Sequence, residues 1–171
     1  MLYLKQVNYK NMELNKQAFW GILLIYCFIS LILFMFTSGG WSQLIILIYL
    51  GSIYSIILAL VLFINITISI NKKNIKLKIS LISLTIFLIA QFIALLVNRG
   101  GCGDGEGSYR FYERLLGTNG WEYCNKGKEA ASLPLDFLGV YFLEIYTWIY
   151  VLIFITFIIY TYYRSFKRYS E

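Results

Sequence analysis

Residues 44–70 read LIILIYLGSIYSIILALVLFINITISI and contain no charged side chain. A bilayer core about 30 Å thick is crossed by about 20 apolar residues of α-helix, so this stretch is long enough to span a membrane. A second run, FWGILLIYCFISLILFMFT, covers residues 19–37, and two more cover residues 79–97 and 137–163. The sequence therefore predicts an all-α integral membrane protein, a bundle of four transmembrane helices in a single domain of 171 residues.

The composition supports this fold class over its alternative, a soluble protein of buried helices. Hydrophobic residues make up 59% of the chain and the mean hydropathy is +0.67, whereas soluble domains are about 45–50% apolar. The first run follows Lys5, Lys10 and Lys16 and is longer than the ~7–15 apolar residues of a signal peptide. We expect it to be a retained span.

Lysine and arginine are concentrated in some of the segments that flank the apolar runs. Such residues favour the cytoplasmic side of a membrane. The charge-free connection 38–43 and the segment 98–136, with five basic and six acidic residues, are expected to face outward. This pattern predicts a multi-pass protein of the bacterial inner membrane with both termini in the cytoplasm. The expected cytoplasmic segments are 1–18, with three Lys, 71–78, with Lys72, Lys73, Lys76 and Lys78, and 164–171, with Arg164, Lys167 and Arg168.

The chain has no histidine, although its formal net charge is +6. Histidine is the commonest general base and a frequent metal ligand. We therefore expect no enzyme, no metal site and no cofactor. Because the positive charges lie between apolar runs, we attribute them to topology and expect no direct contact with nucleic acid; the lipid bilayer is the first partner.

The outward segment 98–136 contains the two cysteines outside the apolar runs, Cys102 and Cys124. In an oxidising compartment they predict a disulfide, which would restrict the unfolded segment by ~3 kcal/mol. Two free thiols are the alternative. The carboxylates of Asp104 and Glu106 superficially resemble a calcium loop, but the twelfth position from Asp104 is Leu115 rather than an acid, so we interpret this run as an acidic turn.

A short helix is expected from Ser108 to Leu116, with the Ser108 hydroxyl as its N-cap. One alternative is that its apolar face packs on the membrane surface or on the ends of the spans. The other is that this face binds a partner. The candidate partner-binding residues of the outward segment are Asp104, Glu106, Tyr109, Phe111, Tyr112 and Trp121.

Glu144 is the one ionisable residue within a predicted span, and such residues are costly in hydrocarbon. It is either a proton or cation site, or a neutral acid hydrogen-bonded to Gln91 or Ser52 of another helix. Gln91 and Asn65 are the other polar side chains singled out inside the spans, where interhelical hydrogen bonds average less than 1 kcal/mol.

In outline, four spans with cysteines in an outer loop are similar to tetraspanins, claudins and the small immunity proteins that protect bacteria from pore-forming toxins. Tetraspanins carry a Cys-Cys-Gly run in the large loop, whereas this chain has Gly-Cys-Gly at residues 101–103. Claudins place their cysteine pair in the first loop, whereas Cys102 and Cys124 stand in the second. We therefore assign the sequence to no family.

Two functions follow as hypotheses. The first is a non-enzymatic membrane protein that recognises a protein partner or senses envelope disturbance through its outer loop and bundle, as an immunity factor or a membrane subunit of a defence system would. The second is a proton-linked small transporter or an oligomeric channel centred on Glu144. A membrane-embedded enzyme ranks third, because two converging titratable groups are not visible in the spans.

Overall fold

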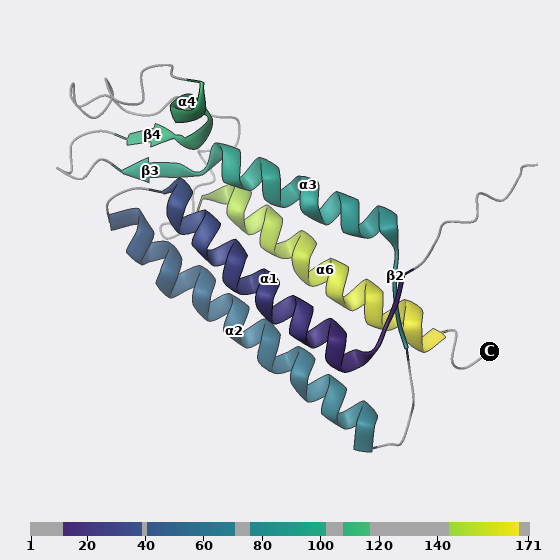
Figure 1. The fold of residues 1–171 in the computed structure, drawn as a ribbon. Helices are drawn as coiled ribbons and strands as arrows, with labels where there is room; N and C mark the ends of the chain where they lie inside the picture. Colours follow the sequence, from purple (N-terminus) through teal and green to yellow (C-terminus); the bar gives the residue numbers. More distant parts are fainter. Residues whose placement is uncertain (1–11, 39–40, 71–75, 102–107, 117–143, 168–171) are drawn as a thin grey trace, which may run out of the picture.

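The computed structural model describes residues 12–38, 41–70, 76–101, 108–116 and 144–167. Within these ranges, four long helices run beside one another and a two-stranded sheet lies at each end of the bundle (Figure 1). The long helices are α1 (Lys16–Thr37), α2 (Trp41–Ile70), α3 (Leu81–Val97) and α6 (Ile145–Lys167).

Three of these helices, α1, α2 and α6, are long and apolar enough to cross a membrane. The chain is therefore an all-α protein with the helices of a multi-pass membrane protein. The fourth, α3, is a shorter apolar helix of 17 residues. Ile79, expected at the start of the third span, belongs to a strand instead, and residues 137–143 of the fourth expected span lie outside the described residues.

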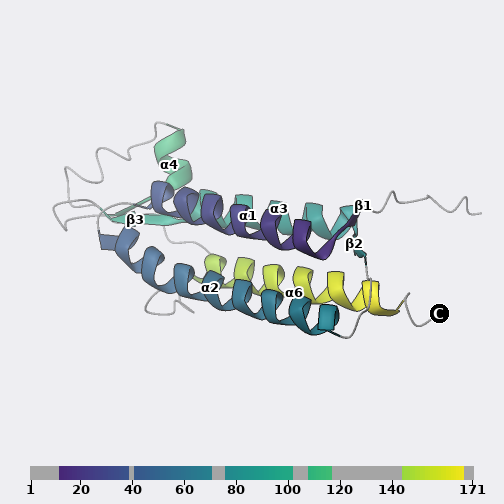
Figure 2. The same ribbon diagram turned by 60° about the horizontal axis from the view of Figure 1, so that its bottom comes forward.

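Sequence neighbours among the long helices run in opposite directions. α1 packs chiefly against α2, and α3 against α6. Figure 2 shows α1 and α3 as one layer above α2 and α6. This arrangement places the start of α1 and the end of α6 at the same end of the bundle.

The outer surfaces of the helices are aliphatic and aromatic. On α1 the exposed side chains include Phe28 and Phe36, and on α2 Phe63 is 68% exposed. Large apolar side chains are likewise exposed along α3 and α6. A surface of this kind is stable against lipid rather than water, which agrees with the membrane interpretation.

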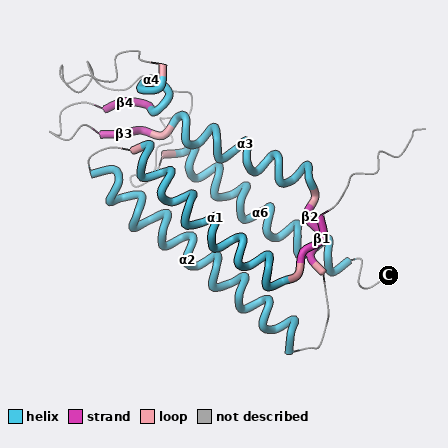
Figure 3. The backbone as a smooth tube through the Cα atoms, in the orientation of Figure 1, coloured by secondary structure: helices cyan, strands magenta, loops and turns pink. Residues whose placement is uncertain are grey.

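A small antiparallel sheet closes the end of the bundle where α1 begins (Figure 3). It pairs β1 (Met12–Leu14) with β2 (Leu77–Ile79), Glu13 opposite Lys78. The Lys78 backbone N–H also donates to Ser165 Oγ of α6, at 3.0 Å. This contact joins the segments that precede α1 and α3 to the last turns of α6.

The opposite end carries β3 (Arg99–Gly101), β4 (Ser108–Arg110) and α4 (Phe111–Leu115). β3 and β4 are antiparallel, with Gly100 opposite Tyr109. The predicted capping by Ser108 is wrong, because Ser108 begins β4 and α4 begins three residues later. Arg110 occupies the N-cap position, and its backbone N–H donates to Glu113 Oε2 at 2.7 Å.

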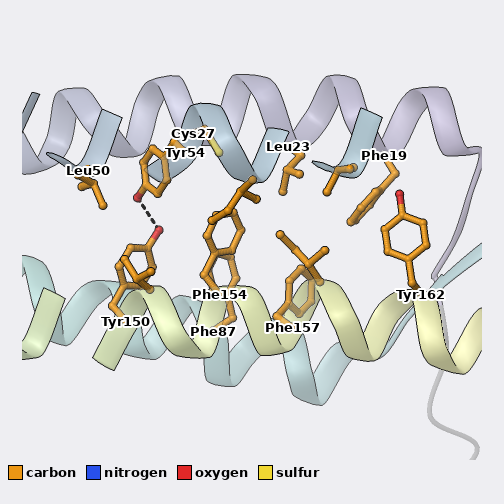
Figure 4. Packing of buried hydrophobic residues seen from close by; sticks show 14 of the residues in the cluster. Phe19, Leu23, Cys27, Leu50, Tyr54, Phe87, Tyr150, Phe154, Phe157 and Tyr162 are labelled. Atoms are coloured by element: carbon orange, nitrogen blue, oxygen red, sulfur yellow. Dashed lines mark hydrogen bonds between the residues drawn. The ribbon is translucent and has the colours of Figure 1, made fainter. Parts of the chain in front are cut away.

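Aromatic rings fill the middle of the bundle (Figure 4). Phe87 of α3 stacks on Phe154 and Phe157 of α6, with ring centroids 5.1 Å apart in both pairs. Stacked rings each gain about 0.5–1.5 kcal/mol beyond the area they bury. These contacts fix how α3 lies on α6.

Candidate functional site

The described part of the segment predicted to face outward is the pair of strands β3 and β4 together with α4, which we call the outer platform. It lies beyond the end of α3 (Figure 1). Its first strand follows α3 directly after Asn98, so the platform is a continuation of that helix. Hydrogen bonds from two polar side chains, Arg110 and Asn98, attach the platform to the long helices.

Arg110 is the central attachment of the outer platform. Its side chain is 1% exposed, and Nη1 donates to the Val97 carbonyl oxygen at 2.8 Å. The same nitrogen lies 3.4 Å from Glu144 Oε2, just before α6. A buried guanidinium is tolerated only where carbonyl and carboxylate oxygens surround it. One side chain thus ties the platform to α3 and α6.

Asn98 makes a parallel attachment to α1. Its side-chain Nδ2 donates to Thr37 Oγ1 at 2.8 Å and to the Phe34 carbonyl oxygen at 3.2 Å. Its own carbonyl oxygen accepts from the Phe111 backbone N–H at 3.0 Å. The Phe34 carbonyl oxygen, in the last turn of α1, also accepts from the Ser38 backbone N–H at 3.2 Å.

Tyr109 is packed into the platform rather than displayed by it. The residue is 8% exposed, and its ring lies over Gly100, where a Cβ atom would come within 2.5 Å of the ring. The Arg114 guanidinium lies 5.9 Å from the ring centroid on the outer side. Glycine at position 100 is therefore required by this close approach, and Tyr109 is a structural residue of the platform.

The platform presents exposed apolar side chains beside the exposed Arg114. Leu115 is 60% and Leu116 is 72% exposed, while Phe111 and Tyr112 are half-buried. Two of the predicted partner-binding aromatics, Phe111 and Tyr112, therefore lie beside an exposed leucine pair. Exposed apolar side chains held on a fixed backbone are typical of interaction surfaces.

A second polar cluster lies inside the bundle and links all four long helices. Tyr54 of α2 and Tyr150 of α6 are hydrogen-bonded through their hydroxyls at 2.7 Å (Figure 4). Tyr150 is also bonded to Tyr26 of α1 at 2.7 Å. Ser30 of α1 bonds Tyr54 and accepts from Gln91 Nε2 of α3, at 2.7 and 3.0 Å. We call these five residues the hydroxyl network.

Glu144 lies in a different place from the one expected. It precedes α6, at the end of the bundle, and its carboxylate faces Arg110 rather than Gln91 or Ser52. Ser52 bonds the carbonyl of its own helix, at Ile48. Asn65, near the opposite end, accepts from the Tyr162 hydroxyl at 2.7 Å. The three predicted intramembrane polar residues therefore lie in three separate clusters.

The sequence analysis missed Arg110 and the tyrosines of the hydroxyl network. A basic residue in a glycine-rich outward segment shows no sign of burial in the sequence. The tyrosines had one available signal: Tyr26, Tyr54 and Tyr150 each stand within an apolar run, where a hydroxyl needs a partner.

Several predicted site residues lie outside the described part of the chain: Cys102, Asp104, Glu106, Trp121 and Cys124. Cys27 is a buried free thiol. Among the residues that the structure describes, no group of three acidic or cysteine side chains is placed to hold a metal ion.

Comparison with known proteins identifies no relative. No family model matches the chain, and neither the curated proteins nor the solved structures include a match.

Proposed function

We propose that this protein is a non-enzymatic component of a bacterial inner membrane that recognises a protein partner through its outer platform, as an immunity factor or a membrane subunit of a defence system would. The observation that carries the proposal is the attachment of Arg110, buried at 1% exposure, to both α3 and α6. It holds the exposed Leu115 and Leu116 in one orientation relative to the spans.

A preorganised apolar surface suits recognition because binding then costs little ordering of the surface itself. Leu115 and Leu116 supply the apolar contact, and Arg114, exposed beside them, supplies a charge. Buried apolar anchors surrounded by polar groups are the usual composition of a binding centre. The partner we propose is a protein with an apolar recess bordered by acidic side chains.

The proposal includes four membrane crossings with both termini in the cytoplasm. The β1–β2 end carries Lys16, Lys76, Lys78, Arg164 and Lys167 against the single acid Glu13 among the described residues, which favours the cytoplasmic side. α3 is about 26 Å long at 1.5 Å per residue. Its 17 residues lie at the lower limit for a span.

A disulfide between Cys102 and Cys124 remains part of the proposal. Both residues fall outside the described part of the chain, and the support is their placement in a segment that the charge pattern assigns to an oxidising compartment.

The carrier or channel centred on Glu144 is supported less well. Its carboxylate lies against Arg110 at the bundle end. Phe87, Tyr150 and Phe154 stack across the interior, with centroids 5.1–6.2 Å apart. Packed rings between the helices favour a static scaffold over a solute path.

The test is photo-crosslinking in intact cells of the source bacterium. A photoreactive amino acid replaces Leu116 in one variant and Met12, an exposed apolar residue of β1, in the other. We expect one discrete protein adduct from position 116 and none of the same mass from position 12. Adding Leu115→Gln should remove that adduct while the protein still inserts.

Lipid adducts alone at position 116 would contradict partner recognition and assign α4 to the membrane surface. Adducts with a second copy of this chain that survive Leu115→Gln would contradict it as well and favour the oligomeric channel. A Glu144→Gln variant then gives the discriminating readout, because loss of ion or proton flux in vesicles belongs to the channel alone.

A further inference from the structure

An open groove lies on the side of the bundle between α3 and α6, in the half nearer the β1–β2 end. Its volume is about 510 Å³, within the roughly 300–1,000 Å³ of small-molecule sites. It lies among the exposed apolar side chains of both helices, on the surface we assign to the bilayer. The lining residues are Ser80, Ile82, Ser83, Ile86, Leu152, Ile153, Thr156, Phe157 and Tyr160.

Two of the hydroxyls in this groove, those of Ser83 and Thr156, are bonded to backbone carbonyl groups of their own segments. Ser83 Oγ donates to the Ser80 carbonyl oxygen at 2.9 Å, and Thr156 Oγ1 donates to the Leu152 carbonyl oxygen at 2.8 Å. Hydroxyls bonded in this way offer little to a polar ligand. The groove floor is therefore effectively apolar along most of its length, as an acyl chain requires.

One end of the groove is polar, and a basic residue of α6 stands one helical turn beyond it. Tyr160 lines the groove, and Arg164 stands four residues later on the same face of α6, one turn nearer the end. The bond from the Lys78 N–H to Ser165 Oγ holds β2 against this turn. Tyrosine and arginine at this depth match the headgroup region of a bilayer.

Charge complementarity identifies the occupant. The charged residues described at the β1–β2 end are five basic side chains and one acid, Glu13. The acid is paired with Lys78 at 2.7 Å. Basic residues at a membrane surface attract anionic lipids by about 1 kcal/mol each. We propose that the groove binds one anionic phospholipid, an acyl chain along Ile82, Ile86 and Ile153 and the phosphodiester at Tyr160 and Arg164.

The site is separate from the outer platform and does not depend on any protein partner. Its occupation would fill the gap between the helices that carry the platform. The lipid would then act as a structural ligand of the α3–α6 pair.

The experiment is native mass spectrometry of the purified full chain from nanodiscs containing equal amounts of phosphatidylglycerol and phosphatidylcholine. We expect one retained phosphatidylglycerol in preference to phosphatidylcholine. Arg164→Gln should lower the ratio of the two retained lipids about fivefold, the equivalent of about 1 kcal/mol. The control Arg114→Gln removes the same charge at the opposite end and should leave the ratio unchanged.

A second pair of variants tests the groove itself. Ile86→Trp fills it and should reduce retention of both lipids, whereas Leu88→Trp, at a similarly exposed position of α3 outside the groove, should not. Equal retention of both lipids in the intact protein, or an unchanged ratio in Arg164→Gln, would overturn the proposal. A dimer lost in Ile86→Trp with no lipid adduct would assign the groove to a second copy and also overturn it.

Discussion

Each end of the bundle carries its own two-stranded antiparallel sheet. The two ends differ in whether their charged side chains are exposed or buried. At the β1–β2 end, Lys78 and Glu13 pair at the surface, with side chains 23% and 45% exposed. At the other end the Arg110 side chain is almost wholly buried. Exposed pairs contribute ~0–1 kcal/mol, whereas removing one partner of a buried pair costs ~3–5 kcal/mol.

The sheets differ in reach as well. β1 and β2 join segments more than sixty residues apart, and β3 and β4 lie close together in the sequence. The β1–β2 end therefore gains its order from chain topology. The outer platform, formed by a local strand pair, is held in position by two buried polar side chains, Arg110 and Asn98. A local strand pair is thus made rigid by a buried polar side chain that reaches two helices.

Arg110→Met is expected to cause the largest loss of stability, because it removes the buried charge that distinguishes the outer platform. It leaves the Val97 carbonyl oxygen and the Glu144 carboxylate without this donor, and we expect a loss of about 3 kcal/mol, because Glu144 is partly exposed. Thermal unfolding in detergent micelles and protease cleavage of the platform measure it. Arg114→Met, which removes an exposed arginine, is the control and should cost under ~1 kcal/mol. Equal effects of the two variants would show that Arg110 does not anchor the platform.

Gly100→Ala tests the packing within the same platform. The new Cβ would lie 2.5 Å from Tyr109 Cζ, and the buried ring has little room to move, so we expect a loss of ~1–3 kcal/mol. Gly21→Ala in α1 is the matched control, because nothing lies within 4 Å of its Cβ position. That substitution should be neutral or stabilising, by up to ~1 kcal/mol. A neutral Gly100→Ala would mean that Tyr109 is not held over β3.

Tyr150→Phe tests the hydroxyl network, which lies in the bundle between the two ends. It keeps the ring stacking on Phe87 but removes the hydroxyl that bonds Tyr26 and Tyr54. Two interhelical bonds predict a loss of ~1–2 kcal/mol in micelles. Tyr163→Phe, at an exposed position, should change nothing. If both variants unfold like the parent protein, the hydroxyl network does not stabilise the bundle.

Glu13→Gln is expected to have the smallest effect. It removes the surface pair with Lys78 and should cost under ~1 kcal/mol. Because exposed charges are screened over about 10 Å at 0.1 M salt, the difference from the parent protein should vanish at 1 M salt. A larger loss that persists in high salt would show that the two ends are anchored by equally strong ion pairs.

Hydropathy and helix length were sufficient to predict the long helices. The expected runs 19–37 and 44–70 lie within α1 and α2, because hydrocarbon allows few structures other than helix for an apolar run. The strands were not predicted, since three-residue strands lack a measurable period. The sheet β1–β2 depends on a pairing between distant segments, which no local pattern reveals.

The candidate site was predicted only in part. Residues 98–136 were singled out by their glycines and charges, and α4 overlaps the expected short helix. The burial of Arg110 was not predictable, because it follows from oxygens on two helices that meet only in the folded chain. Glu144 was expected inside the fourth span, whereas it precedes α6 and its partner Arg110 comes from a distant part of the sequence.

Thiol labelling from the two sides of the membrane tests the central claim, that the outer platform faces outward and the β1–β2 end faces the cytoplasm. Leu116→Cys and Met12→Cys are treated in intact spheroplasts with a membrane-impermeant maleimide, with the parent chain as the control for native thiols. We predict labelling of Leu116→Cys in intact spheroplasts and of Met12→Cys only after lysis. Labelling of both positions from the same side, or the reverse order, would contradict the account.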